Sequence, residues 1–370
     1  MDSVEANWQE SVLYSECTWH QLSPYMGRMK STMARSLVEQ FSKPGDTIYD
    51  PFCGAGTVAL EAWMAGRAVL AGDLSPYAWV LSKAKLQPPR SLSDAVSRFD
   101  RSWAVAKGER DRIDLRRVPK WVRQFYNRET LRETLALGNV LLRRREWYVL
   151  ACLLGILHHW RPGFLSFPAS HTVPHLMGKR YPRSAYPQNY AYRETYPRVL
   201  AKIRRSFARV PKVDRQLRRR VTQSDATALA PKRLTTSPSA IITSPPYMNS
   251  LSYARDNRLR LWFLGVRDYR SLELALSPRR QRFLETMRKL LRIWADILPA
   301  GAPCVLVLGT VQRGGRFRSL PEEFPALVRG SGSSFRVACL CRNVVPPNRK
   351  SWVNCRSARE DTIVVLRRQR

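Results

Sequence analysis

Long apolar runs, a leader-type N-terminus and paired cysteines are all missing from this 370-residue chain. Its longest apolar run, residues 147–157, is about half as long as a membrane-spanning helix must be. Residues 1–10 are polar and acidic, unlike a secretory signal. The seven cysteines include no Cys-x-x-Cys pair, which suits a reducing compartment. We therefore expect a cytoplasmic protein with no membrane partner.

Histidine is also scarce, with five residues in the chain. The side chains that could be combined into a zinc cluster are Cys152, His158, His159, His171 and His175. Their spacing matches no standard set of zinc ligands. A proline precedes His175 and interrupts the helix that would place it beside His171. We expect no bound metal.

Acidic residues are few, and this shortage is the clearest signal in the composition. The chain has 29 Asp and Glu against 63 Lys and Arg, a formal net charge of +34. A chain this basic attracts phosphates. The charge is densest over residues 201–220, where Asp214 is the single acid, whereas a solvated helix face would interleave acids. The predicted nucleic-acid contacts are Arg204, Arg205, Arg209, Arg218, Arg219 and Arg220.

Residues 47–57 have the pattern of a strand followed by a glycine-rich turn, and a helical pattern begins directly afterwards. Glycines there allow a ligand to approach the backbone near a helix N-terminus. The next strand pattern ends at Asp73, about twenty residues on, where an acid can hold a ribose hydroxyl. These two signals predict a nucleoside-type ligand. The alternative is a structural turn with a solvated Asp73.

A second loop, Thr243-Ser-Pro-Pro-Tyr247, follows the apolar residues 240–242. The prolines fix φ and remove backbone donors, so the carbonyls beside them stay free to accept hydrogen bonds. Tyr247 offers a flat face on which a base can stack. Taken alone, the loop could also be an ordinary Pro-Pro turn capped by tyrosine.

The two loops together resemble those of the S-adenosylmethionine-dependent amino-methyltransferases of DNA, the N4-cytosine and N6-adenine group. Residues 23–30 are similar to the segment that closes over the methionine end of the cofactor, and Asp225 matches the acid that reaches its adenine amine. The cofactor-binding residues that the resemblance implies are Tyr25, Lys30, Asp50, Pro51, Phe52, Cys53, Gly54, Gly56, Thr57, Asp73, Leu74, Asp225 and Ala226. The implied catalytic residues are Ser244, Pro245, Pro246 and Tyr247.

The resemblance implies direct attack of an exocyclic amine on the sulfonium methyl, with base flipping in a duplex. The Ser244 side chain and the Pro245 carbonyl would accept hydrogen bonds from the amine, while Tyr247 stacks on the base. Serine at the first loop position favours N4 of cytosine. Cys53 is not a C5-cytosine nucleophile, because it lies inside the cofactor loop.

The expected partner is DNA, and the expected setting is nucleoid-associated DNA methylation, as in restriction–modification. Three alternatives stay open. They are an N6-adenine DNA methyltransferase, an RNA base methyltransferase and an inactive nucleic-acid-binding protein. The recognition sequence, the strandedness of the substrate and the oligomeric state are also open.

Strand and helix patterns alternate along both ends of the chain. The continuous apolar run 304–309 predicts a strand buried on both faces, and residues 335–343 and 362–367 predict an antiparallel pair at the sheet edge. We predict an α/β fold, a doubly wound Rossmann-like methyltransferase sheet with a mostly helical insertion. The predicted parts are residues 1–90, with the cofactor loop; a basic helical insertion for target recognition, 91–222; and residues 223–370, with the catalytic loop.

Overall fold

The computed structural model describes residues 4–5, 16–25, 27–159, 163–166, 182–228, 236–246, 252–276, 279–309, 311–313, 316–318, 320–344 and 360–370. His171, His175 and Tyr247 lie outside these residues. None of the described helices combines the length and the apolar character needed to cross a membrane.

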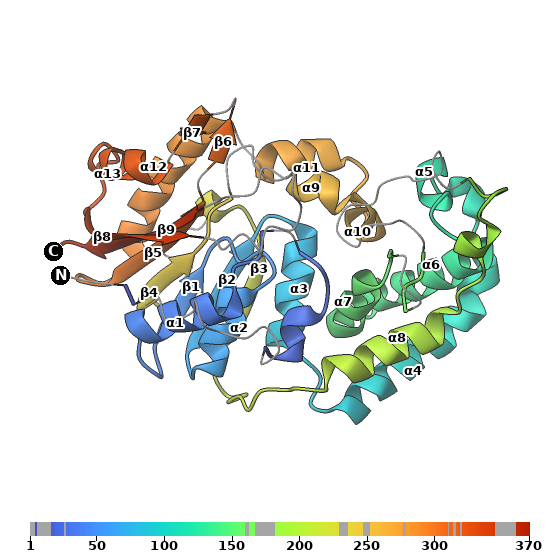
Figure 1. Ribbon diagram of the computed structural model, residues 1–370. Coiled ribbons are helices and arrows are strands. Elements are labelled where there is room, and N and C mark those ends of the chain that lie inside the picture. The colour runs from blue at the N-terminus through green and yellow to red at the C-terminus, as the bar shows by residue number, and fades with distance from the viewer. Residues whose placement is uncertain are drawn as a thin grey trace.

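A seven-stranded sheet forms one side of the molecule, with the strand order β3-β2-β1-β4-β5-β9-β8 (Figure 1). The strands are β1 (Thr47–Asp50), β2 (Ala68–Asp73), β3 (Arg219–Gln223), β4 (Ala240–Thr243), β5 (Pro303–Gly309), β8 (Phe335–Val344) and β9 (Glu360–Arg368). The first five are mutually parallel, whereas β9 runs antiparallel to both of its neighbours. The predicted buried strand and the predicted antiparallel pair are confirmed.

Alternate residues of the strands enter two separate hydrophobic cores, because side chains of a strand point to opposite faces. Ile48 of β1 and Val305 of β5 belong to the core beneath α1 (Ser31–Phe41), α2 (Thr57–Met64) and α3 (Pro76–Leu86). Tyr49 and Leu306 belong to the core beneath α12 (Arg280–Ile297) and α13 (Leu320–Arg329). Helices thus cover both faces, and the predicted doubly wound α/β sheet is confirmed.

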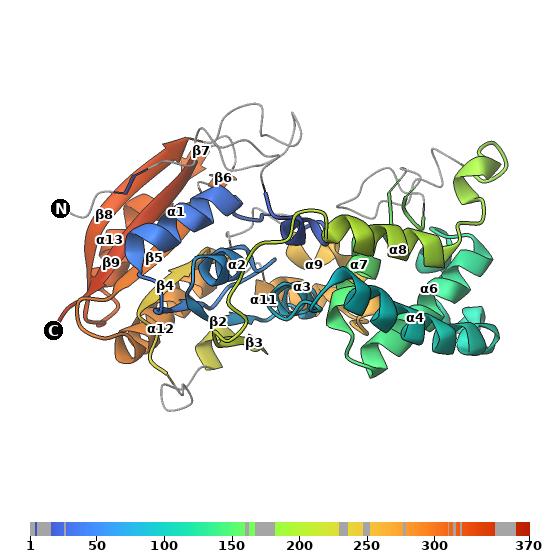
Figure 2. The same cartoon turned by 90° about the horizontal axis from the view of Figure 1, so that it is seen from below.

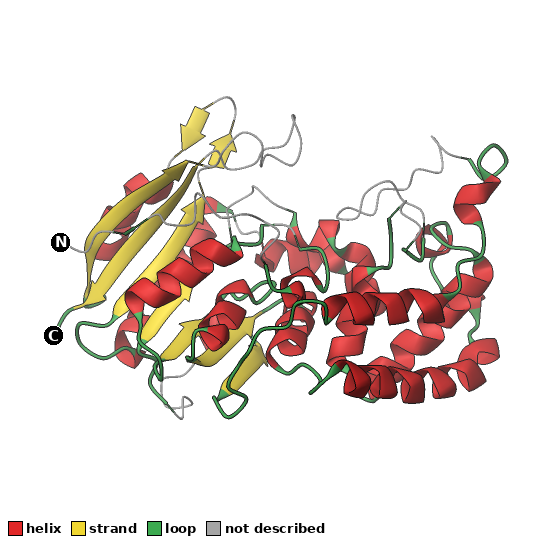
Figure 3. Ribbon diagram, turned by 60° about the horizontal axis from the view of Figure 1, so that its bottom comes forward, coloured by secondary structure: helices red, strands yellow, loops and turns green. Residues whose placement is uncertain are grey.

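The chain leaves the sheet after α3 and forms a helical part before it returns as β3 (Figure 2). Its helices are α4 (Leu92–Glu109), α5 (Lys120–Arg123), α6 (Arg128–Arg143), α7 (Trp147–Gly155) and α8 (Thr195–Ser206). Figure 3 shows this cluster of helices beside the strands. The predicted mostly helical insertion is confirmed, although β3 already starts at Arg219 and belongs to the sheet.

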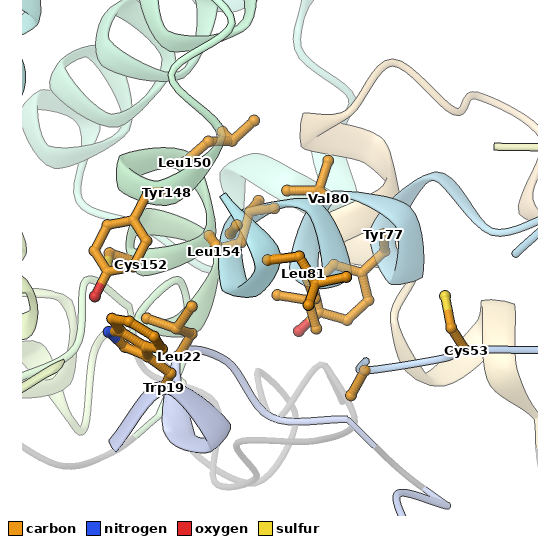
Figure 4. Close-up of a cluster of buried hydrophobic side chains, with 14 of the residues drawn as sticks. Trp19, Leu22, Cys53, Tyr77, Val80, Leu81, Tyr148, Leu150, Cys152 and Leu154 are labelled. Carbon is orange, nitrogen blue, oxygen red and sulfur yellow. The ribbon is translucent and has the colours of Figure 1, made fainter. Parts of the chain in front are cut away.

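The helical part shares one hydrophobic core with the sheet domain. Figure 4 shows Tyr148 and Leu154 of α7 near Leu81 of α3 and near Trp19 and Leu22 of the N-terminal segment. These side chains are at most 3% exposed, and each fully buried large apolar side chain contributes roughly 1.5–3 kcal/mol. We infer that the helical part is held rigidly against α3.

Three short helices follow β4 along the chain. They are α9 (Tyr253–Asp256), α10 (Arg258–Phe263) and α11 (Tyr269–Leu276). In both Figure 1 and Figure 2, α9 and α11 lie between the sheet and the helical part. A small antiparallel pair, β6 (Val311–Arg313) and β7 (Arg316–Arg318), follows β5.

Candidate active site

A cavity of about 430 Å³ lies at the carboxyl ends of the parallel strands. Its wall includes residues that follow β1, β2, β3 and β4 directly. The chain order of the sheet reverses between β1 and β4, and ligands of open α/β sheets bind at such a switch point. The volume is within the range of small-molecule sites.

Most of the predicted site residues meet in this one cavity. Those in its wall are Tyr25, Asp50, Pro51, Phe52, Cys53, Gly54, Thr57, Asp73, Leu74, Asp225, Ala226, Ser244 and Pro246. Lys30, Gly56 and Pro245 are described but do not line it. Gly56 has a left-handed backbone conformation at the point where the loop enters α2. Lys30 is the residue before α1. The two sequence loops therefore share one site.

Asp73 joins the loop after β1 to the loop after β2. Its Oδ2 accepts the Gly54 N–H at 2.9 Å, and its Oδ1 accepts the Ser75 N–H at 2.8 Å. Burial raises the pKa of this carboxyl to about 6, and the backbone N–H groups oppose that shift. Each carboxylate oxygen keeps a second lone pair, so Asp73 can also accept a hydroxyl from a ligand in the cavity.

Asp50 connects the glycine-rich loop after β1 with β4, the strand that leads to Ser244. It is 2% exposed, and its Oδ1 accepts a hydrogen bond from the Thr243 hydroxyl at 2.6 Å. Burial raises the pKa of this carboxyl to about 7, while the hydrogen bond from Thr243 lowers it. The ends of β1 and β4 are thus tied together beneath the cavity.

The Ser244 hydroxyl is oriented by the neighbouring strand. Its Oγ donates to the Val307 carbonyl of β5 at 3.0 Å. Because the one hydroxyl proton is used in this bond, the oxygen faces other partners only as an acceptor. Ser244 can therefore accept a hydrogen bond from an N–H group in the cavity.

Sequence reasoning missed the part of the wall that comes from other elements. The missed residues include Tyr253, Ala275, Leu276, Arg282, Phe283, Thr286, Met287 and Lys289. Arg28, within the predicted segment 23–30, also lines the wall but was not singled out. The helical pattern of α12 indicates an apolar face, on which Phe283 and Met287 are buried. No signal in the sequence shows that one end of this face meets a cavity, because that depends on how α12 crosses the sheet.

The basic segment 201–220 lies elsewhere. Arg219 and Arg220 open β3, whereas Asp225 of the cavity follows the other end of that strand. Arg219 is partly covered, with its guanidinium 4.1 Å from the centroid of the Trp63 ring. Arg218 and Arg220 are exposed, as are Arg204, Arg205 and Arg209 near the end of α8. These arginines do not line the cavity.

Lys85 is buried and supports the glycine loop, the glycine-rich turn that follows β1. Nothing in the sequence indicated this role. Lys85 is 1% exposed, and its Nζ donates to the Ala55 carbonyl at 2.5 Å. Burial, followed by the charge of Arg28, lowers the pKa of Lys85 from 10.5 to about 7. Between these two values the unfolded chain binds a proton that the folded chain does not, so stability rises with pH in this window.

We therefore predict that Lys85→Met flattens the rise in unfolding free energy between pH 7.5 and pH 9.5, relative to the unmodified chain, since both values lie within the window from about 7 to 10.5. Urea denaturation at the two pH values measures this. Lys107→Met, at an exposed position of α4, serves as the control and should leave the slope unchanged. Parallel profiles for Lys85→Met and the unmodified chain would contradict the prediction.

Parts of the chain are similar to known methyltransferases. Residues 21–116, which contain the glycine loop and Asp73, match the family model described as an RMKL-like methyltransferase domain. The type II methyltransferase M.MvaI of Kocuria varians is 35% identical over 88 residues, 22% of this chain and 19% of that protein. The chain thus spans about a fifth of the length of this curated relative.

Similar solved structures include TrmN from Thermus thermophilus, with 12% identity and a TM-score of 0.38 over 95% of this chain and 52% of that one. The rRNA methyltransferase aviRa from Streptomyces viridochromogenes has 12% identity and a TM-score of 0.36 over 98% of this chain and 96% of that one. The chain spans about half the length of the TrmN chain. The family match over residues 21–116 and the match to M.MvaI support a methyltransferase.

Proposed function

We propose that the protein transfers a methyl group from S-adenosylmethionine to the exocyclic N4 amine of cytosine in DNA. The observation that supports this most is the single cavity in which the glycine loop and Asp73 meet Ser244 and Pro246. In this proposal the cofactor site and the acceptor for the amine would thus lie side by side. The match to a type II methyltransferase supports DNA as the polymer.

The cavity residues fit this cofactor. Gly54 has a φ of 48° and no side chain, and a Cβ there would lie 3.3 Å from the Tyr25 ring, so glycine lets this loop and the ring line the cavity together. Asp73 would hold a ribose hydroxyl, and Asp225 would accept from the adenine amine. When bound, S-adenosylmethionine supplies a methyl group on a positively charged sulfur, which is the electrophile.

Ser244 would activate the nucleophile. An exocyclic amine is a weak nucleophile because its lone pair is delocalised into the ring. By accepting one N–H, Ser244 Oγ draws the amine toward tetrahedral geometry and returns electron density to its nitrogen. The new N–C bond forms as the methyl–sulfur bond breaks, and the amine proton leaves to solvent. The products are the methylated base, S-adenosylhomocysteine and a proton.

The neutral serine favours cytosine, as the sequence resemblance implies. Tyr247 would stack on the flipped base, and Pro245 would add its carbonyl as a second acceptor. The exposed arginines of residues 204–220 would contact the DNA backbone away from the cavity. This proposal includes a nucleoid-associated setting and a part in restriction–modification.

A methylation assay tests the proposal. The protein is incubated with labelled S-adenosylmethionine and, separately, duplex DNA, single-stranded DNA and bulk RNA, and the methylated nucleoside is identified by mass spectrometry. We expect N4-methylcytosine in DNA. N6-methyladenine would correct the base, and label in RNA alone would correct the polymer. No label, together with no cofactor binding in calorimetry, would favour an inactive binding protein.

The matched variant in this assay is Ser244→Ala. Loss of one hydrogen bond to the amine should lower the transfer rate about tenfold, while the Kd for S-adenosylmethionine stays the same. A rate equal to that of the unmodified chain would remove Ser244 from the catalytic group.

A further inference from the structure

We propose that Tyr253 forms an aromatic wall of the target-base pocket and that Glu273 and Asn257 position it there. The inference rests on the proposed function, because the base is expected beside Ser244. Tyr253 lines the same cavity as Ser244 and Pro246 and comes from the short helix that follows the catalytic loop.

Tyr253 shares the cavity wall with residues of both sequence loops, Gly54 and Ser244 among them. Desolvation raises the pKa of the Tyr25 hydroxyl well above its ordinary value, and the groups of Asp73 and Tyr253 add to this shift. Tyr25 lines the same cavity, and a Cβ at Gly54 would lie 3.3 Å from its ring. The wall of one cavity is therefore formed by Tyr253 of α9 together with the glycine loop and the loop after β4.

Glu273 of α11 fixes the backbone that carries Tyr253. Its Oε2 accepts the N–H groups of Ala254 and Arg255 at 2.7 and 2.8 Å. Ser252, which precedes the helix, makes no capping hydrogen bond with its side chain. A carboxylate from another helix therefore takes the place of the usual local cap, which sets α9 against α11.

Asn257 fixes the backbone carbonyl of Tyr253. Its Nδ2 donates to the Tyr253 carbonyl at 2.9 Å. Its Oδ1 accepts from Arg260, which is fully buried and also donates to the Leu154 carbonyl of α7 at 3.2 Å. A continuous set of hydrogen bonds thus runs from the helical part to Tyr253. The backbone position of Tyr253 is therefore linked to the docking of the helical part.

Tyr253→Ala tests the proposal on a DNA that the unmodified chain methylates. Loss of an aromatic contact to a base should lower kcat/KM about tenfold and weaken oligonucleotide binding, measured by fluorescence anisotropy. The Kd for S-adenosylmethionine, from calorimetry, should stay unchanged. Tyr253→Phe keeps the ring and should restore activity and DNA binding. Tyr269→Ala is the control, because Tyr269 is partly buried in the neighbouring α11 and does not line the cavity.

Variants of Glu273 test whether this residue positions Tyr253. Glu273→Ala should reproduce the DNA defect of Tyr253→Ala, whereas Glu273→Gln keeps an acceptor oxygen and should restore part of the activity. Tyr253→Ala with DNA binding and kcat/KM like those of the unmodified chain would overturn the inference while leaving the proposed function in place. Equal losses of thermal stability and cofactor affinity in Tyr253→Ala and Tyr253→Phe would also overturn it. If the unmodified chain methylates no nucleic acid, the proposed function fails first.

Discussion

Asp73→Ala should raise the Kd for S-adenosylmethionine about 100-fold, because a hydrogen bond to a charged group in a buried site contributes roughly 1.5–3 kcal/mol. The change removes the expected contact to the ribose and also leaves the N–H groups of Gly54 and Ser75 without their acceptor. The glycine loop would then lose its connection to the end of β2. Calorimetric titration of the cofactor measures the effect.

Two further variants test whether the loss of cofactor affinity is specific to the Asp73 carboxylate. Asp46→Ala also removes a carboxylate that accepts a backbone N–H, that of Lys43 at 2.7 Å, but it lies before β1, away from the cavity. Its cofactor affinity should match that of the unmodified chain. Asp73→Asn keeps one acceptor oxygen and should fall between Asp73→Ala and the unmodified chain. Unchanged affinity in Asp73→Ala would remove Asp73 from the site.

Gly56→Ala should destabilise the fold by about 2–5 kcal/mol, the sum of a left-handed backbone penalty and overpacking. Gly56 has a φ of 71°, and a Cβ there would lie 2.7 Å from the Ser82 hydroxyl and 3.0 Å from the Ser82 Cα. The backbone of α3 cannot move aside, because its apolar side chains are buried against α2 and α7. Chemical denaturation measures the loss, with and without S-adenosylmethionine.

Gly45→Ala is the matched control for Gly56→Ala. Gly45 has a φ of 89°, but a Cβ there would have no atom of the described residues within 4 Å. It should therefore show only the backbone penalty, about 1–2 kcal/mol. Equal losses for the two variants would mean that the contact between Gly56 and Ser82 does not shape the loop.

Local sequence patterns predicted much of this site. The turn after β1 needs glycines because Gly54 and Gly56 both have positive φ, and such positions are visible in a sequence. The continuous apolar run of β5 is equally visible, because every residue of that strand is buried. Strand β3 was missed, since it is an edge strand in which only Val221 is buried. Its residues, Arg-Arg-Val-Thr-Gln, do not show the apolar alternation or apolar run that predicts a strand.

Charge patterns were a weaker guide to side-chain placement. Lys202 belongs to the most basic stretch of the chain, but it is buried and donates to the Gln21 carbonyl at 2.6 Å. Arg260 is fully buried between α10 and α7. A single charged residue at a buried position looks like any surface residue in the sequence, because the backbone carbonyls that Lys202 and Arg260 bind are distant along the chain.

The sequence alone determined the two loops, their order and the α/β pattern that supports them, because each depends on residues close together in the chain. The tertiary structure decided which side chains meet at the cavity. Tyr253 of α9 and one face of α12 reach the cavity from distant segments, and Lys85 of α3 supports the glycine loop from beneath. Their positions follow from the crossing of helices over the sheet, which no local pattern encodes.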